Sequence, residues 1–286
     1  MIYFLATYVF ILGTLIGSFL NVVILRYGTG KKFVGVGERS MCFSCGKTLE
    51  WYELLPVFSF VYLRGKCRGC DSKISWQYPL VEVLTGLVFV GIFLKNYSGL
   101  IFEGSFLFGS VPLFLLTLLQ FLIWSVLIVI TVYDFRHKII PDALVYAFSG
   151  LSLLSVFWFP WVIGSYTDPI LSGIGFFCFF AGLWFISGGR WLGFGDAKLV
   201  LGVGFLLGLV RGLSALVLAF WIGAVVSIAL MAWQYVQQRA IRGKGLQGGR
   251  PQLTMKSEIP FAPFIILGTL ISFFCYVDIL GIGAFF

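Results

Sequence analysis

Residues 2–25 read IYFLATYVFILGTLIGSFLNVVIL and contain no charged side chain. A helix needs about 20 apolar residues to cross the roughly 30 Å hydrocarbon core of a bilayer, and this run meets that length. No basic residue precedes it, so it lacks the charged start of a cleavable signal peptide. We interpret it as a permanent transmembrane helix.

The composition of the whole chain agrees with a membrane environment. Of the 286 residues, 59% are hydrophobic and only 11% are charged, and the mean hydropathy is +1.00. A water-soluble domain carries about 25% charged residues. These values exclude an ordinary soluble globular domain.

Seven further apolar runs follow the first one. Together they predict an all-α integral membrane protein with about eight transmembrane helices and a small cytoplasmic zinc-binding loop domain. The predicted helices occupy residues 2–25, 79–94, 111–133, 143–163, 170–188, 197–210, 213–235 and 260–285. The chain then divides into a first helix at 1–25, the loop domain at 26–78 and a polytopic membrane domain at 79–286.

The positions of the 20 lysines and arginines predict the orientation of these helices. If the loop 26–78 is cytoplasmic, alternation also places 134–142, 189–198 and 236–258 inside, and only Lys95 and Arg211 then lie outside. Because positively charged loops remain in the cytoplasm, we expect the amino terminus to be outside. The charges form no continuous patch, so we expect no nucleic-acid partner.

Four cysteines form two closely spaced pairs in the first loop. The stretch contains C-x2-C twice, with 21 residues between the pairs. Two such pairs can surround one tetrahedral ion, and the cytoplasm is too reducing for lasting disulfides. The spacing therefore predicts a structural zinc that folds this loop, with free or redox-active thiols as the alternative. The expected ligands are Cys42, Cys45, Cys67 and Cys70.

Acidic side chains are rare within the apolar runs, and a charge at membrane depth costs about 3 kcal/mol. Asp134 and Asp196 lie at the predicted cytoplasmic ends of the third and sixth helices. Two adjacent carboxylates do not both ionise readily, so such a pair keeps one acid and one base near neutral pH. The pair could activate water against an amide bond, or relay protons in a transporter.

Residues near the two acids are candidates for supporting roles. Gly193 and Gly195 allow a tight turn and the close approach of a substrate backbone to Asp196. We expect Lys198 to reach toward lipid headgroups rather than to pair with Asp196. Pro141 is expected to fix the loop that follows the first acid.

Taken together, these motifs resemble those of the type IV prepilin peptidases, the bacterial members of the GxGD aspartyl protease group. The matching stretches occur in the family's order and cover most of the chain. They are GSFLNVVILR (17–26), the tetracysteine loop, YPLVE (78–82), Asp134 with IPD (140–142), GFGDAKL (193–199) and IPFAPF (259–264).

The resemblance implies an enzyme of the bacterial inner membrane. The family cuts the basic leader peptide from type IV prepilins or type II secretion pseudopilins at the cytoplasmic face. It often then methylates the new amino terminus with S-adenosylmethionine. By this resemblance Asp134 and Asp196 are the catalytic acids, and residues 1–94 form the methyltransferase half. The candidates in that half are Asn21, Arg26, Gly65 and Glu82.

Two other classes of function remain open from the residues alone. A proton-coupled transporter could use intramembrane carboxylates, although we find no inverted repeat. A non-catalytic scaffold could recruit partners through its zinc loop, but it would leave both aspartates without a role.

Overall fold

The computed structural model describes residues 2–29, 40–103, 110–158, 166–242, 260–279 and 281. Within these ranges the fold is helical, with two isolated β-bridges and no strand. The all-α class predicted from the sequence is confirmed. The chain forms two compact units, Met1–Val132 and Tyr133–Phe286.

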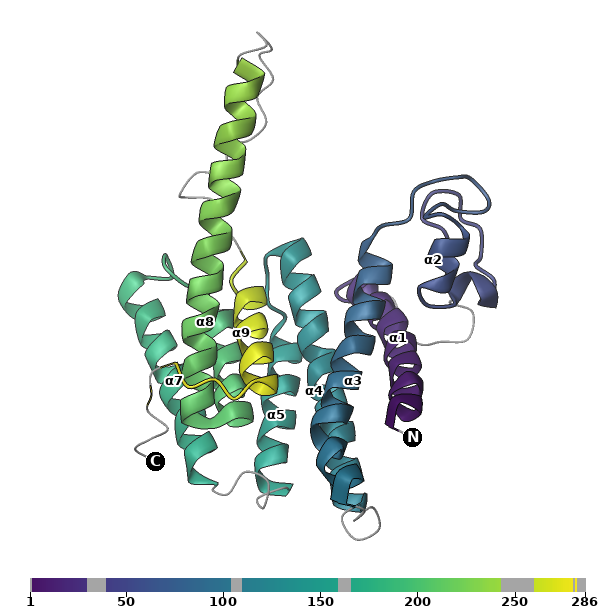
Figure 1. Cartoon of the computed structure of the whole chain (residues 1–286). Helices are drawn as coiled ribbons and strands as arrows, with labels where there is room; N and C mark the ends of the chain where they lie inside the picture. Colours follow the sequence, from purple (N-terminus) through teal and green to yellow (C-terminus); the bar gives the residue numbers. More distant parts are fainter. Residues whose placement is uncertain are drawn as a thin grey trace. The chain divides into compact units, whose positions relative to one another are not determined.

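The first unit contains long helices and the cysteine loop. Its helices are α1 Ile2–Arg26, the 3-10 helix η1 Trp51–Leu54, α2 Phe58–Tyr62, α3 Gln77–Glu103 and most of α4 Ser110–His137. Figure 1 shows α1, in purple, lying alongside α3, with α2 in the loop that joins them.

Close packing of α1 on α3 depends on glycines. A Cβ atom on Gly13 would lie 2.7 Å from the Cα atom of Gly86, and one on Gly17 would lie 2.8 Å from the Cα atom of Glu82. Two small residues four positions apart are typical of helix pairs that approach closely in membranes. Any larger side chain at these positions would force the two helices apart.

α4 packs against α3 through an aromatic stack and a polar cluster. The rings of Phe89 and Phe121 stack with centroids 4.0 Å apart. The side-chain amide of Asn96 donates to Thr117 at 3.0 Å and to Gln120 at 2.8 Å. Neutral polar bonds of this kind hold helices together in lipid.

Among its described residues, the second unit contains the end of α4 and four further helices. They are α5 Asp142–Trp158, α7 Thr167–Ser187, α8 Phe194–Arg242 and α9 Ala262–Phe274. α8 packs against α5, α7 and α9 and therefore forms the centre of this unit.

α8 consists of two arms that run in opposite directions along α7. Phe194, at the start of the first arm, contacts Trp184 near the C-terminal end of α7. The break between the arms lies at the other end of α7, beside Asp168. Phe220, in the second arm, contacts Phe180 and has therefore returned to the half of α7 where the first arm began.

The reversal occurs at Gly208. Its backbone angles, φ 73° and ψ −170°, fall in a region that is essentially restricted to glycine. The carboxylate of Asp168 accepts the N–H of Leu209 at 3.3 Å, so it caps the second arm from a neighbouring helix.

In the part of the chain that the structure describes, five helices are long and apolar enough to cross a membrane, namely α1, α3, α4, α7 and α8, and α5 and α9 are shorter apolar helices. The protein is therefore a multi-pass membrane protein. With α8 counted as two arms, its apolar helices follow the eight predicted runs in order. The number that crosses the bilayer stays a prediction, and the ends of the runs 143–163 and 260–285 lie partly outside the described residues.

The last helix ends at Phe274, so it is shorter than the predicted run 260–285. The backbone becomes extended at Cys275, with φ −103° and ψ 131°. The chain then crosses α8, where the N–H of Ile279 donates to the hydroxyl of Ser214 at 3.3 Å. The prediction of a continuous apolar helix was wrong here because the tail binds to α8 instead.

Candidate active site

Asp134 lies in the last turn of α4 and is almost fully buried, with 3% of its surface exposed. The helix ends just after it, since the N–H of Lys138 bonds to the Asp134 carbonyl at 2.8 Å and Lys138 has a positive φ of 53°. One carboxylate oxygen of Asp134 accepts the backbone N–H of Ala262, the first residue of α9.

Asp196 lies in the first turn of α8 and is 6% exposed. Its Oδ2 atom accepts the backbone N–H of Gly193 at 3.2 Å, and its own N–H donates to the Gly193 carbonyl at 3.1 Å. An acidic side chain at this position closes the first turn of a helix and satisfies a donor that the helix leaves unpaired. The sequence GFGD therefore starts α8 at Phe194 and places the acid in its first turn.

The two carboxylates are close enough to interact electrostatically, although they lie far apart in the chain. Each has one oxygen held by a backbone N–H and a second, fully buried oxygen, Oδ2 of Asp134 and Oδ1 of Asp196, that has no partner among the described residues. Both N–H donors lie at helix N-terminal ends, whose partial positive charge stabilises a nearby anion. The geometry leaves two unbonded carboxylate oxygens available to one reacting group.

The turn at GFGD, closed by the bond from the Asp196 N–H to the Gly193 carbonyl, does not use a left-handed glycine. Neither Gly193 nor Gly195 has a positive φ, and the left-handed positions are Gly188 and Gly189, with φ of 59° and 75°. A Cβ atom on Gly193 would lie 3.3 Å from Oδ2 of Asp196. Gly193 is therefore needed for the close approach of its own backbone to the acid.

Gly195 allows a different contact. A Cβ atom there would lie 3.1 Å from the Cβ atom of Ile140, in the loop that joins α4 to α5. Pro141 ends this loop, because its carbonyl accepts the N–H groups of Leu144 and Val145 in the first turn of α5. Gly195 and Pro141 thus bring the loop after α4 against the start of α8.

The sequence predicted that Lys198 would not pair with Asp196, and it does not. It pairs instead with another acid. Its Nζ atom donates to Oδ1 of Asp142 at 2.8 Å, and it lies 5.0 Å from the ring centroid of Phe194 and 5.3 Å from that of Tyr146. The lysine side chain is only 14% exposed. It joins the start of α8 to the start of α5 and is not free to reach headgroups.

The four cysteines of the first loop meet at one point. Their sulfur atoms all lie within 4.8 Å of one another, and Sγ of Cys42 is 3.9 Å from Sγ of Cys70. A tetrahedral zinc with sulfur ligands at about 2.3 Å places its sulfurs roughly 3.8 Å apart. The cluster can therefore hold a metal ion of this size.

The two cysteine pairs lie in two backbone turns of the same form. We call each turn a knuckle: the first is residues 40–49 and the second is residues 65–74. In the first, the N–H of Cys42 bonds to the Lys47 carbonyl at 2.9 Å; in the second, the N–H of Cys67 bonds to the Ser72 carbonyl at 2.9 Å. Each knuckle also contains one β-bridge. The repeated turn directs two sulfurs from each knuckle at a shared centre.

The surroundings of the cluster favour the thiolates of Cys42 and Cys70, whereas hydrogen bonding with Cys70 and burial raise the pKa of the Cys45 thiol to about 11. The N–H groups of Cys45 and Ser44 lower the pKa of the Cys42 thiol to about 6. The hydroxyl of Ser72 lies 3.2 Å from Sγ of Cys70. Thiolates are the form in which cysteine binds metal, so these groups prepare the cluster for an ion.

The residues that the family resemblance assigned to methyl transfer hold the first unit together. The side chain of Asn21 donates to the Tyr78 carbonyl and accepts from Gln77, both at 3.3 Å. Gly65 has a positive φ of 69° and bonds through its carbonyl to the N–H of Ile74, as part of the second knuckle. Arg26 is the last residue of α1.

Glu82 joins α3 to the loop. Its carboxylate accepts the N–H of Val57 at 2.8 Å and the hydroxyl of Ser18 on α1. Val57 has φ 61° and ψ −49°, an unusual conformation for a β-branched residue. Glu82 thus fixes a strained point of the loop against both long helices.

Sequence reasoning missed the backbone donor of Ala262 and the pairing of Asp142 with Lys198. A backbone N–H leaves no side-chain signal, and the one hint is Pro263, since proline is typical of the first turn of a helix. The Asp142–Lys198 pair joins residues 56 positions apart, which no local pattern reveals.

The fold and the site define a multi-pass membrane protein with a buried aspartate pair and a tetracysteine loop. Residues 11–96 match the bacterial peptidase A24 N-terminal domain, and residues 121–228 match the type IV leader peptidase family. The chain belongs to this family. No solved structure gives a significant match.

Relatives named prepilin leader peptidase/N-methyltransferase support this assignment. The protein of Aeromonas hydrophila is 30% identical over 78% of this chain and 80% of its own length. That of Bacillus subtilis is 28% identical over 92% of both chains. That of Myxococcus xanthus is 34% identical over 79% of this chain, but the match spans only 63% of the relative. These matches give no support to the transporter alternative.

Proposed function

We propose that this chain is a prepilin leader peptidase that uses Asp134 and Asp196 as its catalytic acids, and that it also N-methylates the product. The observation that carries the proposal is the pair itself: two buried carboxylates, each fixed by one backbone N–H and each with one unbonded oxygen. Buried acids in a membrane helix require a functional account, and family membership supplies one.

The chemistry follows from the two free oxygens. One carboxylate, as base, takes a proton from water, whose oxygen attacks the carbonyl carbon of the scissile amide. The other, as acid, gives its proton to the carbonyl oxygen. The tetrahedral diol then collapses and its C–N bond breaks. The first carboxyl group gives the proton that it took from water to the leaving amine, and the second takes a proton from a hydroxyl of the diol, so both acids return to their starting states. The helix N-terminal ends beside each acid stabilise the pair while it carries its single negative charge.

The substrate is proposed to be a type IV prepilin or a type II secretion pseudopilin. In the proposed orientation both acids lie at the cytoplasmic surface of the inner membrane, with the basic leader in the cytoplasm. The scissile bond then lies just outside the apolar helix of the substrate. A glycine before this bond would let the backbone extend toward the acids.

The metal of the first loop is proposed to be zinc, held by Cys42, Cys45, Cys67 and Cys70. Four thiolates leave no open position, so the ion supplies a cross-link between the two knuckles and no catalysis. S-adenosylmethionine is the proposed methyl donor. Asn21, Gly65 and Glu82 are each bonded within the first unit.

The test is leader release from a purified prepilin by the full-length protein in lipid nanodiscs. Asp134→Asn and Asp196→Asn should each lower the rate by about 10²–10⁴-fold, the range that general acid and base catalysis provides. Asp168→Asn is the matched control, because this acid lies at the opposite end of α7 and asparagine can still accept the Leu209 N–H.

Methylation is measured in parallel with a labelled methyl donor and pilin whose leader was removed beforehand. Both aspartate variants should still methylate this product, because the acids act only in cleavage. Full cleavage activity in either variant would remove the pair from the mechanism. Proton flux into protein-containing vesicles without any leader cleavage would favour the transporter instead.

A further inference from the structure

Between the two knuckles, residues 54–63 read LLPVFSFVYL, a run without charge that contains α2. Three of its apolar side chains are strongly exposed: Phe58 at 78%, Val61 at 68% and Tyr62 at 81%. An apolar run of this length is typical of a buried core or of an interfacial membrane segment. The exposure of these side chains excludes the core.

The contacts of Glu82 place this run below the end of α1. The Glu82 carboxylate bonds both the Val57 N–H and the hydroxyl of Ser18. Arg26 is the first cation after the charge-free part of α1. Ser18 lies about 12 Å before it along the helix axis, at 1.5 Å per residue. Val57 is therefore held beside the charge-free part of α1 and not at its charged end.

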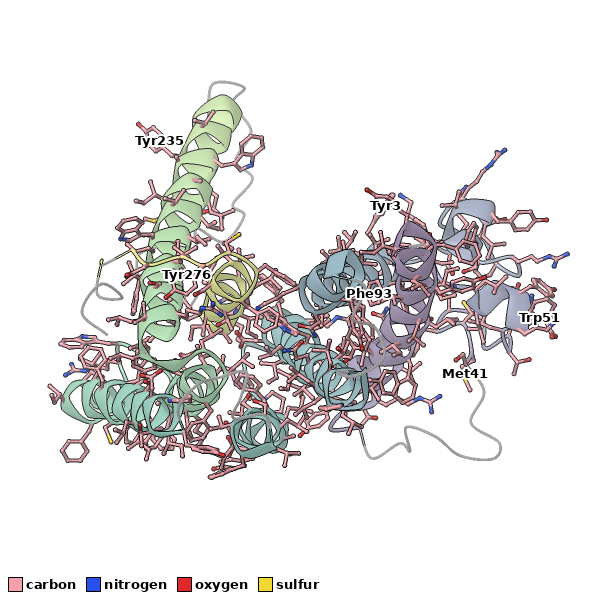
Figure 2. All side chains as sticks on the ribbon, turned by 60° about the horizontal axis from the view of Figure 1, so that its bottom comes forward. Tyr3, Met41, Trp51, Phe93, Tyr235 and Tyr276 are labelled. Atoms are coloured by element: carbon pink, nitrogen blue, oxygen red, sulfur yellow. The ribbon has the colours of Figure 1, made fainter. Side chains whose placement is uncertain are left out.

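Aromatic and basic residues, which favour the membrane boundary, lie next to the apolar run. The ring of Phe60 in α2 contacts Trp76, just before α3, at 4.8 Å, and Trp76 is itself 76% exposed. Figure 1 shows α2 in the loop between α1 and α3, level with the first turns of α3, and Figure 2 shows Trp51 at the outer edge of this loop. Arg64, Lys66 and Arg68 follow the apolar run. Tryptophan and basic residues favour the headgroup region.

At least five of the nine backbone N–H groups of the run are bonded within the protein. Val57 donates to Glu82, Phe58 to the Pro56 carbonyl and Ser59 to the Leu55 carbonyl, and Val61 and Leu63 donate to carbonyls within α2 and just before it. Pro56 has no N–H to satisfy. A segment can lie against lipid only when its backbone groups are bonded internally.

We propose that residues 54–63 form a re-entrant segment that lies in the lipid of the bilayer surface from which the loop emerges. Phe58, Val61 and Tyr62 face the acyl chains, and Arg64 and Lys66 face the phosphates of anionic lipids, whereas Arg68 is held by the hydroxyl of Tyr52 at 2.9 Å. The occupant of this apolar face is the surrounding lipid. The tetracysteine loop is thereby anchored to the membrane at its midpoint as well as at its two ends.

The experiment uses the full-length protein reconstituted in vesicles of phosphatidylcholine and phosphatidylglycerol. A fluorescent amino acid replaces Tyr62 in one sample, Phe58 in a second and Lys73, an exposed residue of the second knuckle, in a third. Quenching is measured with lipids brominated on their acyl chains and, separately, with iodide in the water. Metal content shows that each labelled protein keeps its cysteine cluster.

The probes at positions 58 and 62 should lose most of their fluorescence to brominated lipid and resist iodide. The probe at position 73 should be quenched by iodide and resist brominated lipid. Quenching of position 62 by iodide but not by brominated lipid would overturn the proposal, because water would then cover the segment. Resistance of position 62 to both quenchers would also overturn it, because protein would then cover the segment. Equal lipid quenching at 62 and 73 would also overturn it, because the whole loop would then lie on the membrane.

Discussion

The backbone N–H of Gly193 donates to Oδ2 of Asp196 at 3.2 Å, so the residue before α8 positions the acid that begins it. The bond turns one carboxylate oxygen toward the helix and leaves Oδ1 unbonded. Ala262 does the same for Asp134 from the start of α9. Two helix N-terminal ends therefore orient the two acids.

Gly193→Ala should lower the turnover number for leader cleavage while leaving KM nearly unchanged. The new methyl group would lie 3.3 Å from Oδ2 of Asp196 and move the carboxylate by a few tenths of an ångström. A misplacement of about 1 Å can cost roughly 10²-fold in rate, so we expect a loss of about 3- to 10-fold. Steady-state kinetics with a prepilin measure both constants.

Gly182→Ala in α7 is the control for this substitution, because a Cβ atom there meets nothing within 4 Å. It should cleave at the parent rate. If Gly193→Ala also cleaves at that rate, the bond to Asp196 does not set the position of the acid.

The acids and the cysteines could be found from the sequence because each carries a local signal. A charge in an apolar run is conspicuous, and the C-x2-C spacing already fixes a knuckle. The partners of these residues carry no such signal. Lys198 meets Asp142 across 56 residues, and Glu82 meets a backbone N–H at Val57, so only the folded chain reveals them.

The division of α8 was predictable in part. The pattern of apolar residues predicted a break between 210 and 213, and the break lies at Gly208. Arg211 suggested a loop, but it stays helical and lies 4.6 Å from the ring centroid of Tyr276 in the C-terminal tail. The reversal is set by a glycine and a cap from α7, which hydropathy does not register.

The ion pair of Lys198 and Asp142 should contribute little stability. Asp142 is 62% exposed, and pairs that are open to solvent contribute about 0.2–1 kcal/mol. A double-mutant cycle of Lys198→Met and Asp142→Asn, followed by denaturant unfolding in detergent, measures the coupling. A coupling energy well above about 1 kcal/mol would show that the pair is screened by lipid or protein from water.

Loss of one thiolate should release the metal and open the loop. Cys45→Ser removes one of four ligands, so zinc content should fall and trypsin should cut faster after Arg64, Lys66 or Arg68. Cys178→Ser is the matched control, since Cys178 lies in α7 and outside the cluster. Equal metal content and equal trypsin resistance in both variants would contradict a metal held by the cluster.

The reversal of α8 should depend on Asp168. Asp168→Ala removes the acceptor of the Leu209 N–H, and loss of such a cap costs about 1 kcal/mol. Asp168→Asn should cost less, because its amide oxygen can still accept. Gly208→Ala should cost about 1–3 kcal/mol, since its backbone region is essentially closed to other residues. Unfolding in mixed detergent micelles, followed by circular dichroism, ranks the three variants. If alanine at 208 is as stable as glycine, α8 does not turn at this residue and the two-arm description is wrong.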